Sequence, residues 1–321
     1  MVEFATQRQS WLDQLLDLPH GIPSHDTFNR VLQLIDPDAL SRCLGQDGED
    51  LLGHLDQKQL CFDGKKLKGV SPRSKGNQGM YILNAWVAEN RVCIGQKKVG
   101  EKTNEITAIP ELISELDIAG SIVSIDAIGC QQKIAAQIIN QQADYLLALK
   151  KNQKELYDQT QDSFELNPAQ IMDEQWEYDH GRYEQRRCEI LPAQGMLLPE
   201  LIDQWEGIHT LVKIEAHREE KGKRSTEIRY YISSATMDNP RYYNHLVRGH
   251  WGIENLLHWH LDISFSEDAS RARKGFAPQN LATLRKMALH RMTQMSDKLS
   301  IKKRRFRASL NNDYLLKVLQ L

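Results

Sequence analysis

Residues 248–274 form the most informative stretch of this chain, RGHWGIENLLHWHLDISFSEDASRARK. Its first half has the spacing of a helix, and the one acid in that half, Glu254, lies among histidines, tryptophans and amides. Side chains four residues apart share a helix face, so we expect His250, Glu254 and His258 to line up. A strand-like run at Leu261–Phe265 and a dense basic block follow. An acid among groups that stack on bases or contact phosphates indicates chemistry on nucleic acid.

Charge is unevenly distributed along the sequence. The net charge is −2 at pH 7, yet residues 1–60 hold ten Asp and Glu against four Lys and Arg. Residues 271–307, in contrast, hold twelve Lys and Arg against one acid. A basic end of this kind is the electrostatic footprint of a polyphosphate partner. The alternative is a solvated, charged helical tail.

Length and composition are those of a globular protein. At 321 residues the chain can bury a full core and hold two or three structural units. No apolar run approaches the roughly 18 residues of a membrane span, and the N-terminus lacks the features of a secretory signal. The five cysteines are widely spaced and odd in number, which argues against a disulfide framework or a structural zinc site. We therefore expect a cytoplasmic protein with no membrane partner.

The order of the predicted elements is that of a mixed α/β sheet with helices on its faces. After a helical N-terminal segment come strands at 59–68, 80–89, 91–98, 122–127 and 144–149, with helices at 105–116 and 131–140. Three antiparallel strands followed by parallel crossover units account for this order. Alternating segments within 152–234 predict a β-rich insertion of about 75 residues. The Glu254 helix and a further helix at 280–292 follow it.

Two aspartates upstream stand where aspartate is disfavoured. Asp63 lies inside the first predicted strand, between Phe62 and Gly64, and burying it unpaired would cost several kcal/mol. Asp126 ends the run IVSIDA, and ligands in α/β sheets bind at the carboxyl ends of strands. Each alone is more often a turn or capping residue. Together with Glu254 they predict a site.

Three carboxylates that converge on one point repel one another unless a cation neutralises them. Oxygen ligands without an accompanying set of cysteines or histidines favour Mg²⁺ or Mn²⁺. Two such ions bridged by a carboxylate can activate water on one side of a phosphodiester and stabilise the leaving oxygen on the other.

Local segments resemble a known family along roughly residues 10–315. These are FDGKKLKG, EKTNEITAIPELISELDIAGSIVSIDAIGCQQKIA, DYLLALKKNQ, HGRYEQR, RYYISS and HWGIENLLHWHLDISFSEDASRARKG. They are similar to the H-repeat-associated transposases of bacterial insertion sequences, which are DDE transposases of the ribonuclease-H-like superfamily. The last segment is the most specific of them.

The resemblance implies a fold and an activity. The fold is a ribonuclease-H-like mixed five-stranded sheet with flanking helices, interrupted by the β-rich insertion before the last catalytic helix. Asp63, Asp126 and Glu254 would be the catalytic, metal-binding triad of a bacterial DNA transposase. With two Mg²⁺ or Mn²⁺ ions it would hydrolyse a phosphodiester at the element ends and then transfer the strand into target DNA. The class also implies a homodimer that holds two ends in a synaptic complex.

The same resemblance divides the chain. The parts are an N-terminal helical segment (1–58), the first part of the catalytic domain (59–153), the insertion (154–236), the last part of the catalytic domain (237–300) and a basic C-terminal tail (301–321). Family members usually begin earlier, so we expect the N-terminal segment to be truncated. A truncated, non-catalytic DNA-binding remnant of such a transposase is the alternative function.

The surroundings of the glutamate depart from the broader class. Relatives there carry the pattern Y-x2-R-x3-E-x6-K, whereas this chain has Val247, His250 and Leu261 around Glu254. His250 and its neighbours would therefore have to contact phosphate and base. A rival interpretation takes His250, Glu254 and His258 as a zinc hydrolase site. Histidines eight residues apart lie about two turns apart, too far to share one ion comfortably.

Several other residues are candidates for contact with DNA. Lys65 shares a strand face with Asp63, and Lys150 follows the last core strand. His180 and Arg182 open a basic cluster in the insertion, where a charged hairpin is the alternative. Trp251 could stack on an unpaired base, with core packing as the alternative. The full set of DNA-binding candidates is Lys65, Lys150, Arg182, Arg248, His250, Trp251, Asn255, His258, Arg271 and Arg273.

Overall fold

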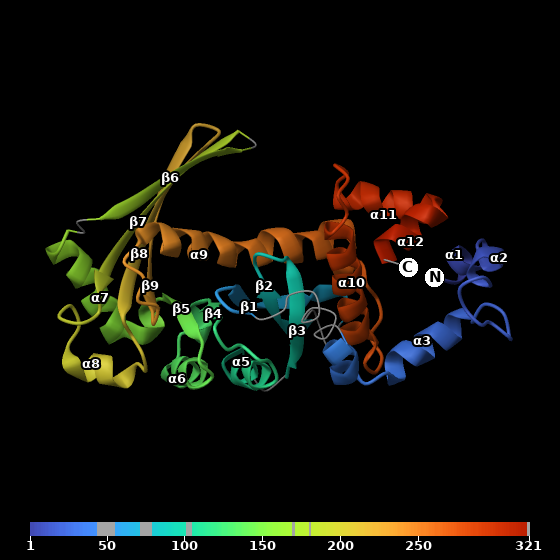
Figure 1. Ribbon diagram of the computed structural model, residues 1–321, viewed down its shortest axis with the longest axis horizontal. Helices are drawn as coiled ribbons and strands as arrows, with labels where there is room; N and C mark the ends of the chain where they lie inside the picture. Colours follow the sequence, from blue (N-terminus) through green and yellow to red (C-terminus); the bar gives the residue numbers. More distant parts are fainter. Residues whose placement is uncertain (44–54, 71–78, 101–104, 169–170, 180, 320–321) are drawn as a thin grey trace.

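A single mixed sheet organises the protein. The computed structural model describes residues 1–43, 55–70, 79–100, 105–168, 171–179 and 181–319. Within these ranges nine strands pair in the order β3-β2-β1-β4-β5-β9-β8-β7-β6 (Figure 1). The strands are β1 (Gln59–Leu67), β2 (Met80–Val87), β3 (Val92–Val99), β4 (Ile122–Ile125), β5 (Asp144–Leu149), β6 (Met172–Asp179), β7 (Arg182–Pro192), β8 (Thr210–Glu220) and β9 (Lys223–Ser233).

Strands β1 to β5 confirm the element order predicted for the first half of the chain. β1 pairs antiparallel with β2, and β2 with β3, whereas β4 lies parallel to both β1 and β5. These strands are buried on both faces, which explains their nearly continuous apolar sequences. Helices α5 (Glu105–Ser114), α6 (Gln132–Asn140), α7 (Lys154–Leu166) and α8 (Pro199–Gln204) lie on one side of the sheet (Figure 1).

The predicted β-rich segment extends the main sheet. β9 pairs antiparallel with β5, so β6 to β9 extend the same sheet, which has nine strands rather than five. An open β5 edge would expose unpaired N–H and C=O groups, and β9 satisfies them. β6 had no clear signal in the sequence because MDEQWEYD is mostly acidic and polar.

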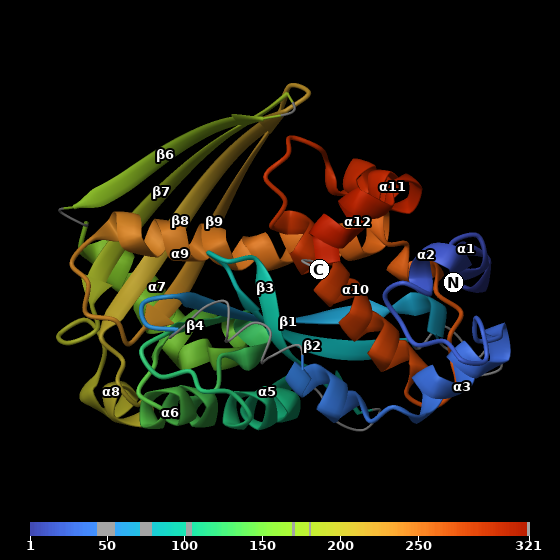
Figure 2. The ribbon, with the colours of Figure 1, turned by 45° about the vertical axis from the view of Figure 1, so that its right-hand side comes forward.

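A long helical segment crosses the opposite side of the sheet from α5 and α6 (Figure 2). It consists of α9 (Pro240–Gly252) and two π-helical turns, η5 (Ile253–His258) and η6 (His260–Ser264). The strand predicted at Leu261–Phe265 is therefore wrong. Its apolar residues alternate as in a strand, but Leu261 packs with Ile253 and Leu257 in a helical core cluster. Tertiary packing overrides the local β-propensity there.

The helix α9 approaches the sheet closely at Gly249. A Cβ atom at this position would collide with Oε1 of Gln59. The buried Gln59 amide donates hydrogen bonds to Oγ of Ser124 at 2.9 Å and to the Leu246 carbonyl at 2.7 Å. Gln59 thereby joins β1, β4 and α9.

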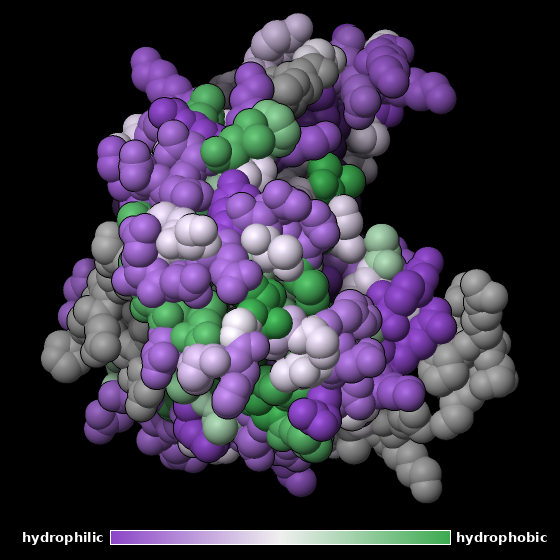
Figure 3. Space-filling view, turned by 90° about the vertical axis from the view of Figure 1, so that its right-hand side faces the viewer, coloured by the Kyte–Doolittle hydropathy of each residue, from purple (hydrophilic) through white to green (hydrophobic). Residues whose placement is uncertain are grey.

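Helices from both ends of the chain lie together at one end of the molecule (Figures 1 and 2). They are α1 (Val2–Thr6), α2 (Gln9–Leu12), α3 (His25–Leu34), α10 (Ala277–Thr293), α11 (Ile301–Leu310) and α12 (Asn312–Leu319). The buried Asn280 of α10 donates to the carbonyls of Leu32 and Ile35, both at 2.9 Å, and so holds the end of α3. This end of the molecule is mostly hydrophilic, with apolar side chains showing in between (Figure 3).

Part of the basic C-terminal block is structural. Arg304 is buried and its guanidinium pairs with Asp297 at 2.8 Å. Ile301, Tyr314 and Val318 pack α11 and α12 into a core cluster, so residues 301–319 are not a free tail. Among the described residues, no helix is long and apolar enough to cross a membrane.

Replacing Gly249 with alanine tests the close approach of α9. Glycine to alanine in a helix is normally stabilising by roughly 0.5–1 kcal/mol. Here we expect Gly249→Ala to destabilise by about 1–3 kcal/mol, because the new methyl group overpacks against Gln59. Thermal unfolding measures the change. His245→Ala, at an exposed position of the same helix, is the control and should leave Tm nearly unchanged. A Tm of Gly249→Ala at or above the wild-type value would contradict the packing.

Candidate functional site

The three acids singled out in the sequence lie on elements that meet. Asp63 lies in β1 and Asp126 directly follows β4. The two strands are parallel neighbours, and the residues just before the aspartates, Phe62 and Ile125, are register partners. Glu254 lies in η5, which contacts β1 on the side of the sheet opposite α5 and α6. The fold therefore brings residues nearly 200 positions apart to one place.

Electrostatics shows that the acids act on one another. Burial is the main cause that raises the pKa of Asp63 to about 8, and the charges of Glu254, Asp126 and Glu105 raise it further. Burial also raises the pKa of Glu254, which the charge of Asp126 raises further and that of Arg229 lowers. Neighbouring like charges thus add to burial in disfavouring the ionised form of Asp63.

Glu105 is a fourth acid that sequence reasoning missed. It opens α5, and its carboxylate lies against Gly64, where a Cβ atom would collide with it. Burial and the charge of Asp126 raise its pKa. An acid in the first turn of a helix is ordinary, so the sequence carried no signal for this role.

The donor set suits a hard divalent cation in its chemistry. Asp63, Asp126, Glu254 and Glu105 offer only carboxylate oxygens, which Mg²⁺ and Mn²⁺ prefer. In the part of the chain that the structure describes, no three His, Cys, Asp or Glu side chains already form a metal cluster. Burial is the main cause that raises the pKa of Asp63, and a bound cation would relieve the part that the charges of Glu254, Asp126 and Glu105 add.

His258 lies directly beside Asp63. Its Nδ1 is 3.4 Å from Oδ2 of Asp63, and its Nε2 is 3.3 Å from Nδ2 of Asn84. The Asn84 amide also lies within hydrogen-bonding distance of the Ile82 and Asp63 carbonyls, which assigns this atom as nitrogen and a donor. Burial, aided by the charges of Lys65 and Lys286, lowers the pKa of His258 to about 3. The neutral ring therefore accepts at Nε2 and presents Nδ1–H to Asp63.

His250 serves a different neighbour. Its Nδ1 lies 3.0 Å from Oγ of Ser124 in β4, and burial lowers its pKa to about 4 despite the opposing charge of Asp126. His250 and His258 both reach the sheet, but they contact different strands because about two helical turns separate them. The π-helical turn η5, with i→i+5 bonding, begins after His250 and ends at His258.

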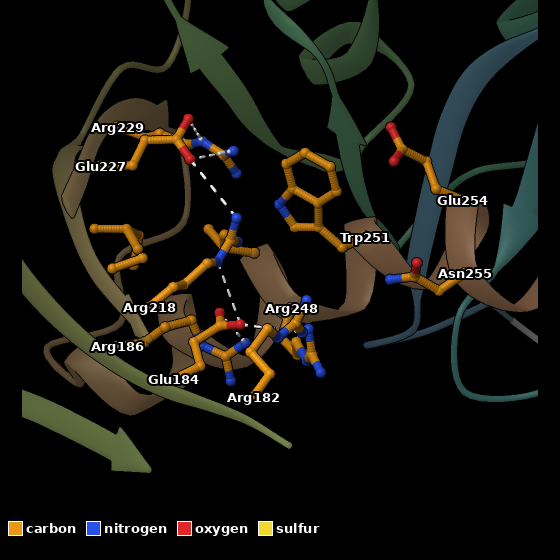
Figure 4. A pocket seen from close by; sticks show the side chains of 13 residues that line it. Arg182, Glu184, Arg186, Arg218, Glu227, Arg229, Arg248, Trp251, Glu254 and Asn255 are labelled. Atoms are coloured by element: carbon orange, nitrogen blue, oxygen red, sulfur yellow. Dashed lines mark hydrogen bonds and ion pairs between the residues drawn. The ribbon is translucent and has the colours of Figure 1, made fainter. Parts of the chain in front are cut away.

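Four of the DNA-binding candidates line a common pocket with Glu254. They are Arg182, Arg248, Trp251 and Asn255. The pocket has a volume of about 210 Å³ and lies between α9 and the strands β7 to β9 (Figure 4). The guanidinium of Arg229 stacks over the Trp251 ring at 4.4 Å from its centroid. Sequence reasoning missed Arg229, which looked like an ordinary strand residue.

The remaining candidates lie elsewhere. Lys65 is buried, and its Nζ lies 2.7 Å from Asp262 and 3.3 Å from Glu267. The Arg273 side chain donates to the Gly69 carbonyl at 3.2 Å, and Arg271 lies beside the same glycine. Lys150 is exposed at the end of β5. His180 lies outside the described residues.

Comparison with known proteins is consistent with this arrangement. The family profile described as "Transposase DDE domain" matches residues 54–290, and the one described as "DDE_Tnp_1-associated" matches residues 1–46. "Putative transposase YncI" of Escherichia coli O157:H7 is 36% identical over 329 residues, which cover 99% of this chain and 83% of that protein. "H repeat-associated putative transposase YhhI" of Escherichia coli strain K12 is 34% identical, covering 99% of this chain and 86% of the relative.

A third relative widens the range of sources. "Uncharacterized protein in dhlA 3'region" of Xanthobacter autotrophicus is 40% identical over 247 residues, 74% of this chain and 81% of that protein. The domain profile alone spans well over half of the sequence, and it contains Asp63, Asp126 and Glu254. The chain belongs to the family of the transposase DDE domain and to its H-repeat-associated branch.

Proposed function

We propose that this protein is a DNA transposase of a bacterial insertion sequence that cuts and joins DNA with divalent metal ions. Asp63, Asp126 and Glu254 are the catalytic residues and hold the ions. The observation that carries the proposal is that β1, β4 and η5 meet, so that the charges of Glu254 and Asp126 act on the buried Asp63. Such repulsion costs stability unless the site has a use for it.

Each residue has a role in the proposed reaction. When bound, two Mg²⁺ or Mn²⁺ ions would activate water for attack on the phosphodiester at the element end and stabilise the leaving oxygen. Asp63, from within β1, and Asp126, directly after the neighbouring β4, present carboxylates, and Glu254 adds a third from η5, which contacts β1. His258, fixed by Asn84, orients the Asp63 carboxylate. The 3′-hydroxyl freed by hydrolysis then attacks target DNA in the same site.

The sheet supports a ribonuclease-H-like origin of the catalytic part. Three antiparallel strands followed by two parallel crossover strands, with the acids on the first and fourth strands, match the order that the family resemblance implies. Element ends and target DNA are the proposed partners, and a homodimer would hold two ends together. Lys150, Arg271 and Arg273 remain proposed DNA contacts away from the acids.

The zinc hydrolase alternative receives no support from the geometry. His250 contacts Ser124 and His258 contacts Asp63 and Asn84, so the two rings do not share one ligand position. The non-catalytic remnant differs from the main proposal in activity alone, so cleavage assays separate the two.

Cleavage of element-end DNA tests the catalytic assignment. With Mg²⁺, we expect the wild type to nick a duplex that carries the inverted repeat beside the gene. Asp126→Asn should reduce the rate of nicking by more than about 100-fold. Loss of a residue that only orients a metal ligand typically reduces activity by about 10–100-fold, and loss of the ligand itself should cost more. Gel analysis of the labelled strand measures nicking. Asp162→Asn, an exposed position on α7, is the matched control. Equal nicking by wild type and Asp126→Asn would refute the assignment, and DNA binding without any nicking would favour the remnant.

The raised pKa of Asp63 predicts a pH dependence of stability. In the metal-free protein this group ionises at about pH 8 rather than at its ordinary 3.8, so the native state holds the proton more tightly. The contribution of Asp63 to the free energy of unfolding is fully present below about pH 4 and is lost as the pH rises toward and through 8. We expect the difference in Tm, Asp63→Asn minus wild type, to grow over this range in EDTA.

Adding Mg²⁺ should reverse the comparison, because the wild type gains Tm from binding and Asp63→Asn does not. Differential scanning calorimetry measures both. A pH-independent difference between the two proteins would mean that Asp63 is not electrostatically strained.

His258 has a separate test as a positioning residue. We expect His258→Ala to retain the fold and to raise the Mg²⁺ concentration needed for half-maximal nicking by roughly 10–100-fold, because the Asp63 carboxylate loses the group that orients it. His260→Ala, whose ring contacts Ser264 instead, is the matched control. A Mg²⁺ titration like that of the wild type would show that His258 does not orient Asp63.

A further inference from the structure

The inner face of the extended sheet gathers arginines beside the proposed catalytic site. Alternation along β7 puts Arg182, Glu184 and Arg186 on the face that looks toward α9. Arg218 of β8 and Arg229 of β9 share that face, and Arg248 comes from α9 itself. These five arginines line the pocket on one side of Trp251, and Glu254 and Asn255 lie on the other side (Figure 4).

Glutamates hold the arginines in place without neutralising them. Glu184 is buried and has Arg182, Arg186 and Arg218 at 3.2, 3.7 and 3.3 Å. Glu177 pairs with Arg186 and Arg248, both at 2.8 Å. Glu227 accepts two hydrogen bonds from Arg229. Five guanidinium groups thus face three carboxylates, so the wall retains positive charge in a partly enclosed space, which strengthens its field.

The guanidinium groups are arranged for an anion with several oxygens. Arginine presents planar, forked donors that match phosphate. Arg182 and Arg248 are 43% and 40% exposed, so both have donors free to turn toward a ligand while their glutamates keep a second partner. The pocket, at about 210 Å³, is smaller than the roughly 300–1,000 Å³ of sites for drug-sized ligands. A single charged group of a larger polymer suits it.

We propose that this arginine pocket binds a backbone phosphate of the DNA strand next to the phosphodiester that is cut. The inference rests on the proposed function, which places the scissile phosphate at Glu254. His250, which the sequence suggested for phosphate contact, is turned to Ser124 and does not line the pocket. The ring of Trp251, between the arginines and Glu254, supports the sugar that links the two phosphates.

Salt dependence of binding tests the pocket without cleavage. Binding of a fluorescein-labelled duplex is followed by anisotropy in EDTA at several salt concentrations. For Arg182→Gln and Arg248→Gln we expect the slope of log affinity against log salt to become shallower by about 0.9 for each phosphate that the variant no longer neutralises. Arg224→Gln is the matched control, since Arg224 lies on the opposite face of β9 with Glu219. Pocket variants with the wild-type slope would overturn the proposal.

Uncharged backbone substitution locates the phosphate. Each phosphate around the element end is replaced in turn by methylphosphonate, a change that requires no protein variant. We expect methylphosphonate at one position beside the cut to weaken DNA binding by the wild type. The same substitution should weaken binding by Arg248→Gln little further, because that variant has already lost the contact. If each methylphosphonate weakened both proteins equally, the pocket would not be the binding site for that phosphate. The same salt titrations are made with a duplex of arbitrary sequence. If the wild type and the pocket variants gave the same slopes with it as with the element end, the pocket would be assigned to target DNA instead.

Cleavage is measured separately with Mg²⁺. A wild type that binds with the expected slopes but does not nick would refute the proposed function and leave the pocket supported. A wild type that nicks while the slopes of the pocket variants stay unchanged would refute the pocket alone.

Discussion

The packing of α9 onto the sheet is the constraint on which the rest of the structure depends. Gly249 removes the side chain that would keep the helix away, and the buried Gln59 amide links β1, Ser124 of β4 and the Leu246 carbonyl of α9. His250 adds a second link to Ser124. A helix fixed at this distance from the sheet places the following π-helical turn, with Glu254, against β1, which carries Asp63 and pairs with β4, the strand that Asp126 follows.

Two opposed electrostatic environments meet at Trp251. On one side burial and the charges of neighbouring acids raise the pKa of Asp63, and on the other the arginines are held apart by glutamates that they outnumber. Neither environment is favourable by itself, because like charges in a partly buried space repel. The DNA backbone would supply negative charge to the arginines, and divalent cations would supply positive charge to the acids.

Much of the catalytic part could be predicted from the sequence, because its informative residues break local rules. Aspartates in or directly after apolar strands are conspicuous, and five strands and their helices have clear periodicity. The π-helical turns could not be predicted, since they depend on packing of Leu261 and on the contact of Gly252 with Trp86. Four of the five pocket arginines lie on strands whose alternation of arginine and glutamate also suits a solvated hairpin. Only the pairing of β9 with β5 turns that face toward α9.

That pairing has a consequence for the shape of the nucleic acid. β5 and β9 are joined by a continuous ladder from Leu146 to Leu149, so the arginine face and the strand that leads to the acids belong to one hydrogen-bonded sheet. A sheet of this kind does not fold around a ligand as two hinged bodies do. In the proposed complex any deformation therefore falls on the DNA and not on a hinge in the protein. Flexible pyrimidine–purine steps at the element end would make that deformation easier, which gives the protein a means of preferring a sequence without touching its bases.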